Sequence, residues 1–340
     1  MSKMNAVVVG CGAIGPIHMN AVHATEYAAL YGVCDIENER ADRYAKEFGC
    51  KAFYSIEDVL RDYAVDSIHI CTPHYLHGPM LTAAVSAGKK AVVEKPVCMN
   101  LNELREVYKT VRKMNVPVCS VIQNRLNPSI VKLKDMIDNQ TYGKVKGLKG
   151  ILTWNRPPEY YKSAAWRGKW DTEGGGLVIN QALHTLDLLC YLGGTPEAIK
   201  ASCDTRALQE FIEVEDTAEA TLYLHDGVLA HFYATNNYSM NSSYDIEVHM
   251  EKAWAKYMLG GLWLMEPDGC RQIAHDKEMD GEKAYWGIGH KALIDRFYSN
   301  LAGRGGAYTS FEDAFLSVAL VDGLYNSARS GEKLRITLDL

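Results

Sequence analysis

A glycine-rich turn close to the start of the chain constrains the fold more strongly than any other feature. The apolar run 6–9 leads directly into the sequence GCGAIG, and a helical pattern follows it. Glycine at position 10 permits a tight turn, glycine at position 12 lets the backbone approach a pyrophosphate, and glycine at position 15 allows close packing of helix and strand. A strand, this turn and a helix in that order predict a dinucleotide-binding fold. We expect the turn to contact the cofactor through Gly10, Cys11, Gly12, Ala13, Ile14 and Gly15.

The next predicted strand ends in an acid that bears on the choice of cofactor. Asp35 lies about 20 residues beyond the turn, where a carboxylate can accept hydrogen bonds from both ribose hydroxyls. A carboxylate there repels the 2′-phosphate of NADP, and no Arg or Lys follows until Arg40. NAD is therefore favoured over NADP, although Arg40 or Arg43 could still turn toward a phosphate. The alternative, a glycine turn that binds no ligand, is disfavoured because the strand, the helix and the acid agree.

The first part of the chain alternates β-branched runs with amphipathic stretches, which is the pattern of parallel strands joined by crossover helices. Helix ends carry the expected signals, with Gly49 and Gly88 after helices and a capping box at Ser55 and Asp58. The expected strands are 6–9, 29–35, 51–54, 67–71, 91–94 and 117–122, and the expected helices are 14–24, 37–48, 55–62, 78–87 and 101–114. Residues 1–123 are therefore predicted to form a doubly wound parallel α/β domain of the Rossmann type.

After Gln123 the pattern changes to that of an antiparallel sheet. Apolar and polar side chains alternate over 217–224, which fits a strand with one buried face, and Asp226 with Gly227 marks a hairpin turn. Further strands are expected at 145–154, 198–205, 228–236, 244–250 and 254–259, and helices at 128–139, 284–301 and 310–327. Residues 124–340 are thus predicted to form a second, α+β domain that binds substrate, and its last helices could pack on the first domain.

Composition excludes several classes of function. The chain has 340 residues, of which 47% are hydrophobic and 23% charged, as expected for a globular protein with a sizeable core. Its formal net charge of −6 opposes binding to phosphate backbones, so no nucleic-acid partner is expected. The best candidate for a membrane span, 177–192, is interrupted by polar residues, so no membrane association is expected. Nine cysteines without a CxxC pair, and no recognisable signal peptide, favour a reducing, cytoplasmic location.

Three clusters of polar residues lie where ligands of such a sheet bind, at the carboxyl ends of strands. They are CTPHYLH at 71–77, EKP at 94–96 and GGGLVINQALHTLD at 174–187. The third is expected to be helical, and spacings of four and three then place Asn180, His184 and Asp187 on one helix face.

Together with the glycine turn, these clusters resemble the glucose-fructose oxidoreductase and inositol dehydrogenase (Gfo/Idh/MocA) family. The resemblance extends over essentially the whole chain, including the closing SFEDAFLSVALVDGLYNSARSG. It implies a Rossmann domain, then a domain with a largely open antiparallel sheet, and hydride transfer between a nicotinamide and a sugar, polyol or sugar derivative. In that family the EKP lysine and the histidine of the second-domain helix are the catalytic pair, which match Lys95 and His184. Further cofactor contacts are expected from Cys71, Thr72, Pro73, His77, Glu94 and Lys95; the family pattern places Thr72, Pro73 and His77 against the adenosine and the nicotinamide ribose.

The chemistry of alcohol oxidation agrees with this pair. Removing the hydroxyl proton as hydride leaves carbon needs a base, and histidine has the unperturbed pKa nearest neutrality, so His184 is expected to be the general base. Lys95 would hydrogen-bond the same oxygen, favouring the developing alkoxide or polarising the carbonyl in the reverse direction. The competing interpretations are a hydrogen-bonded core histidine for His184 and an ordinary surface lysine for Lys95.

One position departs from the family pattern. Many relatives carry an aspartate four residues before the catalytic histidine, whereas this chain has Asn180. An amide can orient the substrate or the imidazole, but it cannot accept a proton or stabilise an imidazolium as a charge would. Asn180 is retained among the catalytic candidates. Similar INQ sequences occur in relatives that act on nucleotide-linked or glycosidic sugars, which shifts the prediction toward such substrates.

Other charged and aromatic residues are candidates for substrate binding. The segment WRGKW at 166–170 offers rings for sugar C–H faces and charged donors for hydroxyls or phosphate, although a packed loop with solvated charges fits it equally well. Asp187 could bind substrate hydroxyls or be an acid on the helix surface. The candidate substrate-binding residues are Asp187, Arg125, Trp166 and Arg167.

A metal site at His74 and His77 is the competing interpretation of the first polar cluster. Cys71 is its only soft neighbour and no fourth ligand is in view, so no metal is predicted.

The leading prediction is an NAD-dependent oxidoreductase that acts on a ring CH–OH group of a sugar, glycoside, nucleotide sugar or polyol. A second keeps NAD bound and returns the hydride after transient oxidation, so that a glycosidic bond is cleaved or a centre epimerised. A third, a non-catalytic NAD sensor, is opposed by the presence of Lys95 and His184. A broad sheet with large side chains on both faces predicts a homodimer or homotetramer. The sequence leaves open which sugar and which hydroxyl react, and in which direction.

Overall fold

In the computed structural model, which describes residues 3–276 and 288–338, the chain divides into two compact units. The first unit contains the chain up to Gln123 together with 290–315, and the second contains 124–289 and 316–339. The division after Gln123 falls where the sequence changes from alternating strands and helices to longer strands.

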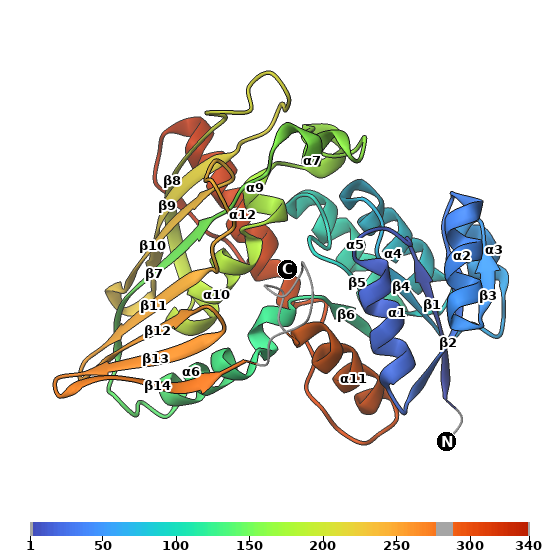
Figure 1. Cartoon of the computed structure of the whole chain (residues 1–340), viewed down its shortest axis with the longest axis horizontal. Helices are drawn as coiled ribbons and strands as arrows, with labels where there is room; N and C mark the ends of the chain where they lie inside the picture. The colour runs from blue at the N-terminus through green and yellow to red at the C-terminus, as the bar shows by residue number, and fades with distance from the viewer. Residues whose placement is uncertain (1–2, 277–287, 339–340) are drawn as a thin grey trace. The chain divides into compact units, whose positions relative to one another are not determined.

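The first unit is built on a six-stranded parallel sheet with the strand order β3-β2-β1-β4-β5-β6 (Figure 1). This order confirms the doubly wound sheet, and its switch point lies between β1 and β4, where such sheets bind ligands. Its elements are β1 (Met4–Val9), α1 (Gly15–Ala24), β2 (Ala28–Cys34), α2 (Asn38–Phe48), β3 (Lys51–Phe53), α3 (Ile56–Arg61), β4 (Ser67–Ile70), η1 (His74–Leu76), α4 (His77–Ser86), β5 (Lys90–Val93), α5 (Leu101–Met114), β6 (Val118–Ser120) and α11 (Gly289–Leu301).

Local sequence explains where these elements begin and end. The N-cap half of the predicted capping box is confirmed, because Ser55 Oγ accepts the Asp58 N–H at 3.2 Å at the start of α3. Gly49 ends α2 in the left-handed conformation, with φ of 65°. Helix α11 contacts β4, since the Tyr298 hydroxyl lies 2.7 Å from both Ser67 Oγ and His69 Nε2. A segment from the end of the chain thus completes the first unit.

The second unit is built on a nine-stranded sheet with the order β14-β13-β12-β11-β7-β10-β9-β8-β15. Neighbouring strands are antiparallel except β7 and β10, which are parallel, so the expectation of an antiparallel sheet is right for all but one pair. Its elements are η2 (Gln123–Leu126), α6 (Pro128–Asp138), β7 (Val145–Thr153), α7 (Pro158–Lys162), α8 (Trp170–Glu173), α9 (Leu177–Asn180), α10 (Leu183–Gly193), β8 (Pro196–Asp204), β9 (Thr217–Leu224), η3 (His225–Gly227), β10 (Leu229–Thr235), β11 (Asp245–Met250), β12 (Trp254–Met258), β13 (Gly261–Glu266), β14 (Gly269–His275), α12 (Asp313–Ser330) and β15 (Leu334–Arg335).

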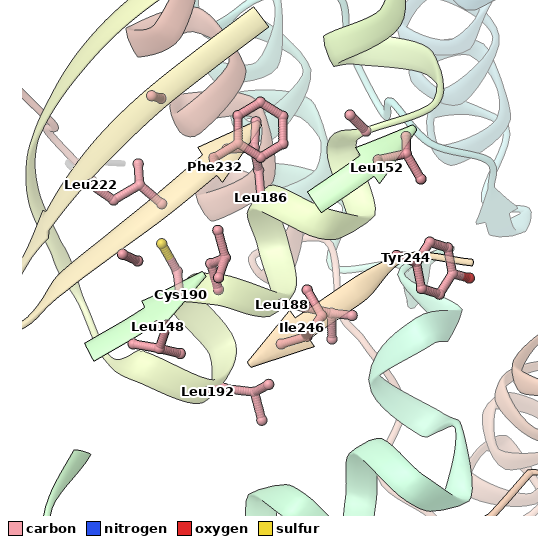
Figure 2. Packing of buried hydrophobic residues seen from close by; sticks show 14 of the residues in the cluster. Leu148, Leu152, Leu186, Leu188, Cys190, Leu192, Leu222, Phe232, Tyr244 and Ile246 are labelled. Carbon is pink, nitrogen blue, oxygen red and sulfur yellow. The ribbon is translucent and has the colours of Figure 1, made fainter. Parts of the chain in front are cut away.

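Helix α10 forms the centre of the second core. All of 183–190 is buried, which fits a helix that is apolar on nearly every side. Figure 2 shows this helix packed against one face of the sheet. The labelled residues of this cluster include Leu186, Leu188, Cys190 and Leu192 of α10, Leu148 and Leu152 of β7, Phe232 of β10 and Ile246 of β11.

Several sequence predictions need correction. The single helix expected over 174–187 is wrong in two places, because 174–176 are not helical and the chain is interrupted between α9, which ends at Asn180, and α10, which begins at Leu183. Strands β13, β14 and β15 and the short helices α7 and α8 were not expected; most side chains of β14 are exposed, so it lacks the alternation that marks a strand. Residues 284–287 of the expected helix 284–301 lie outside the described residues, and α11 begins at Gly289. The hairpin turn at Asp226 and Gly227 is confirmed.

Within the described ranges, no helix combines the length and the apolar character that crossing a bilayer requires.

The carboxylate of Asp216 anchors the loop that precedes β9, and its removal provides a test of this part of the fold. The fully buried side chain accepts N–H bonds from Arg206, Ala207 and Leu208 at 2.9–3.1 Å. Burial alone would raise the pKa of Asp216, but these hydrogen bonds outweigh it and the pKa is lowered. We expect Asp216→Ala to lower the free energy of unfolding by about 3 kcal/mol, because three backbone N–H groups, that of Leu208 buried, lose a charged acceptor.

The measurement is denaturant unfolding followed by circular dichroism. The matched control is Glu210→Ala, which removes an exposed acid from the same loop and should change stability by less than about 0.5 kcal/mol. Equal stability of the two variants would contradict the anchoring role.

Candidate active site

The glycine turn has the geometry that a dinucleotide requires. A Cβ atom at Gly10, where φ is 95°, would lie 2.5 Å from the carbonyl oxygen of Cys71, and one at Gly15 would lie 2.3 Å from the Gly10 carbonyl oxygen. Neither position can hold a side chain without moving backbone. At Gly12 nothing lies within 4 Å of the Cβ position, so space is open on that side of the turn. These residues fit a pyrophosphate lying against the backbone at position 12.

Asp35 lies at the end of β2 and holds the turn in place. Its Oδ2 accepts the Cys11 N–H at 2.9 Å and its Oδ1 accepts the Glu37 N–H at 2.9 Å. Arg40 also reaches this carboxylate, with Nη1 3.4 Å from Oδ2, and its Nη2 donates to Glu37 at 2.6 Å. Oδ2 thus has two donors and Oδ1 one, so Oδ1 keeps acceptor capacity for a ribose hydroxyl. The nearest basic group is therefore already paired with acids, which fits NAD better than NADP.

The polar cluster at 71–77 is joined to the EKP segment by His77. The Nδ1 atom of His77 lies 2.7 Å from the Pro96 carbonyl oxygen and its Nε2 atom 2.8 Å from the Thr72 carbonyl oxygen. Burial lowers the pKa of His77, although both carbonyl contacts oppose the shift. Both ring nitrogens face carbonyl oxygens, so His77 is not arranged as a metal ligand with His74. Contacts of Thr72, Pro73 and His77 with a ribose remain predictions.

Glu94, at the end of β5, is held in a buried cluster of histidines that sequence reasoning missed. Its Oε1 accepts hydrogen bonds from His18 Nε2 at 3.0 Å and His290 Nε2 at 3.3 Å, and its Oε2 accepts the Lys95 N–H at 3.1 Å. Burial would raise the pKa of Glu94, but the two histidines outweigh it and hold the pKa well below its usual range. The hydrogen bonds continue from His18 Nδ1 to His69 Nδ1 at 2.9 Å.

The ligand atoms of His18, Glu94 and His290 lie within 4.8 Å of one another, a spacing that a metal ion also needs. The carboxylate already accepts hydrogen bonds from both rings and from the Lys95 backbone. One sequence feature points to this hydrogen-bonded cluster: Ser67 and His69 are polar residues within a predicted strand, and the structure buries both of them.

In the second unit, His184 lies in the first turn of α10 and is 8% exposed. The break between α9 and α10 means that Asn180, His184 and Asp187 do not share one regular helix face, contrary to the prediction. Sequence reasoning brought them together through a spacing that holds only in an uninterrupted helix.

Asp187 and Arg125 are brought together as a buried ion pair. Arg125 Nε donates to Asp187 Oδ2 at 2.8 Å and Arg125 Nη2 donates to Oδ1 at 2.6 Å, with side-chain exposures of 9% and 1%. This bidentate pair occupies both oxygens of the carboxylate. The ion pair gives both residues a structural role, because it joins α10 to η2. A role for either residue in substrate binding remains a prediction.

A buried carboxylate that was not predicted lies behind Asn180. Glu173 is fully buried; its Oε1 accepts the Asn180 Nδ2–H and its Oε2 accepts the Gly168 N–H, both at 2.6 Å. Burial is the main cause that raises the pKa of Glu173 to about 7. The hydrogen bond fixes the amide of Asn180, with its nitrogen toward Glu173.

A second carboxylate, Glu215, holds the other side of the glycine loop 174–176. It accepts the Gly176 N–H at 3.0 Å, the Val178 N–H at 2.8 Å and the Tyr325 hydroxyl at 2.9 Å. Burial raises the pKa of Glu215 to about 7 as well. The glycines are required by packing, because a Cβ atom at Gly175 would lie 2.0 Å from the Tyr325 hydroxyl.

These raised pKa values predict how stability depends on pH. Glu173 and Glu215 bind a proton more tightly in the folded chain, at about 7, than at the ordinary value of 4.5, so their stabilising protonation is complete at low pH and is lost as pH rises through about 7. We expect Glu173→Gln to lose less stability than the wild type between pH 5 and pH 8, measured by denaturant unfolding.

The exposed Glu210→Gln serves as the control and should follow the wild-type pH dependence. A Glu173→Gln profile parallel to that of the wild type would show that Glu173 does not titrate in this range.

Two family models match the chain. A model described as an oxidoreductase family with an NAD-binding Rossmann fold matches residues 4–122, and a model of the GFO/IDH/MocA C-terminal domain matches residues 130–256. The matches cover the parallel sheet of the first unit and much of the large sheet of the second.

Curated relatives match at moderate identity. The uncharacterized oxidoreductase YrbE of Bacillus subtilis is 28% identical over 230 residues, which are 66% of this chain and 64% of that protein. The myo-inositol 2-dehydrogenase of Thermotoga maritima is 25% identical over 56% of this chain and 55% of its own length. The chain thus spans less than two thirds of the length of these relatives.

Solved structures match over nearly the whole chain. The WlbA dehydrogenase from Bordetella pertussis, in complex with NADH and UDP-GlcNAcA, is 28% identical, with a TM-score of 0.86 over 99% of this chain and 100% of that one. A levoglucosan dehydrogenase in complex with NADH and levoglucosan is 20% identical, with a TM-score of 0.87 over 98% of this chain and 100% of that one, and it shows the shared fold alone. The two family models, the glycine turn closed by Asp35 and these matches agree: the chain belongs to the Gfo/Idh/MocA family of oxidoreductases and carries its NAD-binding Rossmann domain.

Proposed function

We propose that this protein is an NAD-dependent oxidoreductase that transfers a hydride between nicotinamide and a ring hydroxyl of a sugar, glycoside, nucleotide sugar or polyol. The observation that carries the proposal lies within the first unit: a glycine turn with open space at Gly12, held by Asp35, is combined with Lys95 two residues after β5. In a parallel sheet the ends of β1 and β5 lie at the same edge, so both features belong to one ligand-binding side.

In the proposed reaction Lys95 and His184 are the acid/base pair. Bound NAD supplies the hydride acceptor. His184 accepts the proton of the substrate hydroxyl as the C–H electron pair leaves, and the carbon–oxygen double bond forms. Lys95 places an ammonium group against the same oxygen and stabilises the negative charge that develops on it. The backbone N–H of Lys95 donates a hydrogen bond to the Glu94 carboxylate, which holds the backbone at the base of the lysine side chain.

The proposed substrates are sugars that carry a further group. Support comes from the WlbA dehydrogenase, whose structure contains UDP-GlcNAcA, and from the INQ sequence at Asn180. Because inositol dehydrogenases are among the relatives, polyols are tested as substrates together with these sugars.

We further propose that the protein works in the cytoplasm as a homo-oligomer, a dimer or a tetramer. One face of the large sheet is covered by α10, while side chains on the other face, such as Leu229, are exposed.

Lys95→Met and His184→Ala test the acid/base pair. Each should lower kcat by about 100- to 10,000-fold on whichever sugar the wild type oxidises, because charge stabilisation or proton removal is lost. NADH formation is measured with a panel of sugars, glycosides, inositols and nucleotide sugars, and NAD binding is measured in parallel by calorimetry.

The control variants Lys113→Met and His23→Ala remove an exposed lysine and an exposed histidine from the first unit and should keep wild-type rates. A Lys95→Met variant as active as the wild type would refute the assigned role. If NAD copurifies with the protein and product forms without net production of NADH, the reaction is a redox-neutral cycle and not a net oxidation.

Asp35→Asn tests the choice of cofactor. Loss of the negative charge removes the repulsion of a 2′-phosphate and frees Arg40, so the ratio of kcat/KM for NAD to that for NADP should fall by about tenfold or more. Glu39→Gln, an exposed acid on the neighbouring helix α2, is the control and should leave the ratio unchanged. If the ratio is unchanged in Asp35→Asn, Asp35 does not determine the choice between NAD and NADP.

A further inference from the structure

Two arginines of the second unit lie against the ring of one tyrosine. Tyr160 lies in α7, with Arg156 just before this helix and Arg167 a few residues after it. The guanidinium carbon of Arg167 is 4.2 Å from the centre of the Tyr160 ring, and that of Arg156 is 5.1 Å from the same centre. Arg156 also lies 4.6 Å above the ring of Trp154. The rings fix both guanidinium planes, since cation–π contacts favour a stacked position.

Among the described residues, neither guanidinium has an acid as a hydrogen-bond partner. Arg156 Nη1 donates to the Asn155 carbonyl oxygen at 2.7 Å and to Asn241 Oδ1 at 2.9 Å. Arg167 Nη1 donates to Ser163 Oγ at 2.7 Å and to the Tyr160 carbonyl oxygen at 3.3 Å. All four acceptors are neutral, and in the part of the chain that the structure describes neither arginine forms an ion pair.

The hydrogen bonds of both arginines leave the same guanidinium edge, formed by Nε and Nη2, without an acceptor among the described residues. Every hydrogen bond uses Nη1, while the Nε atom of each is buried without an acceptor among the described residues. Buried donors of a charged group are costly when they have no acceptor. The Nε–Nη2 edge is also the one with which Arg125 of this chain holds both oxygens of Asp187. A planar fork of this kind is suited to bidentate binding of a carboxylate or a phosphate.

This pair of arginines is connected to the segment that carries the proposed catalytic histidine. The Tyr160 hydroxyl accepts the Gln181 Nε2–H at 3.0 Å, and Gln181 follows Asn180 directly. The buried carboxyl group of Glu173 acts electrostatically on both Tyr160 and Arg167, while its oxygens accept hydrogen bonds from Asn180 and Gly168.

We propose that Arg156 and Arg167, stacked on Tyr160, form an anion subsite that receives a carboxylate or phosphate substituent of the sugar substrate. The inference rests on the proposed function and narrows its substrate class to acidic sugars. Trp154 and Tyr160 provide apolar ring surface for sugar C–H groups beside the charged site. A neutral polyol would leave the guanidinium donors without an acceptor and would gain nothing from them.

The test compares matched substrates in matched variants. One pair is a nucleotide sugar with a uronic carboxylate and the same nucleotide sugar with a CH2OH group; the other is a sugar phosphate and its free sugar. Arg156→Met and Arg167→Met should each lower kcat/KM for the acidic member by about 10- to 100-fold, because a hydrogen bond to a charged group is lost, and should change the neutral member by less than about threefold. The pair that responds identifies the carboxylate or the phosphate as the group bound.

Arg206→Met, which removes an exposed arginine of the same unit, is the control and should behave as the wild type on all four compounds. Unfolding midpoints of the variants verify that they fold, and Arg156→Lys, which keeps the charge without the fork, should retain only part of the preference. Equal losses on acidic and neutral members, or no loss on either, would overturn the subsite.

A binding measurement separates this inference from the proposed function. Calorimetry of the wild type with the uronic nucleotide sugar, with and without NAD, should show binding that Arg156→Met weakens by at least about tenfold. If no sugar is oxidised but this binding difference is present, the proposed function fails and the anion subsite holds. If sugars are oxidised without any preference for the acidic members, the proposed function holds and the subsite fails.

Discussion

The buried carboxylate of Glu94 is the interaction on which the arrangement of the first unit depends. A buried charge is tolerated only where opposite charges or hydrogen-bond donors surround it. Here the donors come from α1, from α11 and from the backbone of Lys95, which are distant in sequence. Satisfying this one group therefore draws together the helix after the glycine turn, a helix near the end of the chain and the EKP segment. Lys95 owes its fixed backbone position to the same contact.

The second unit solves a similar problem in a different way. Glu173 and Glu215 lie on either side of three consecutive glycines; Glu173 accepts hydrogen bonds from the Gly168 backbone and the Asn180 amide, and Glu215 accepts two from backbone N–H groups. Burial is the main cause that raises the pKa of each of them to about 7, whereas the two histidines lower that of Glu94. The glycines allow the backbone to approach Tyr325 and Glu215 closely, which side chains would prevent. The loop that leads into α9 is thus determined by packing and by these two carboxylates together.

Local patterns predicted the fold well and the site only in part. The glycine turn, the capping box at Ser55 and the strand 217–224 depend on neighbouring residues, and each is found where it was expected. The parallel pairing of β7 with β10 depends on strands far apart in sequence, which no local alternation records.

The same distinction explains the errors at the site. Asp187 was interpreted from its spacing to His184, but it is held by Arg125, 62 residues away. His18 and His290 contribute to one carboxylate from opposite ends of the chain, and no local signal joins them. Even within one segment, the spacing of Asn180 and His184 gave a wrong prediction because it assumed an unbroken helix, whereas the helix is interrupted between Asn180 and Leu183.

Asn180 stands where the family resemblance leads us to expect an aspartate, and its hydrogen bond to Glu173 bears on what this difference does. An amide cannot take up a proton, so Asn180 cannot relay one, and proton transfer falls to the proposed pair Lys95 and His184. Yet the negative charge is not absent from this region, because Asn180 donates to the buried Glu173. With a pKa of about 7, Glu173 is partly ionised near neutral pH, and its charge reaches its surroundings through an oriented amide. The chain thus keeps a carboxylate close to its proposed catalytic segment, while burial shields that carboxylate from solvent.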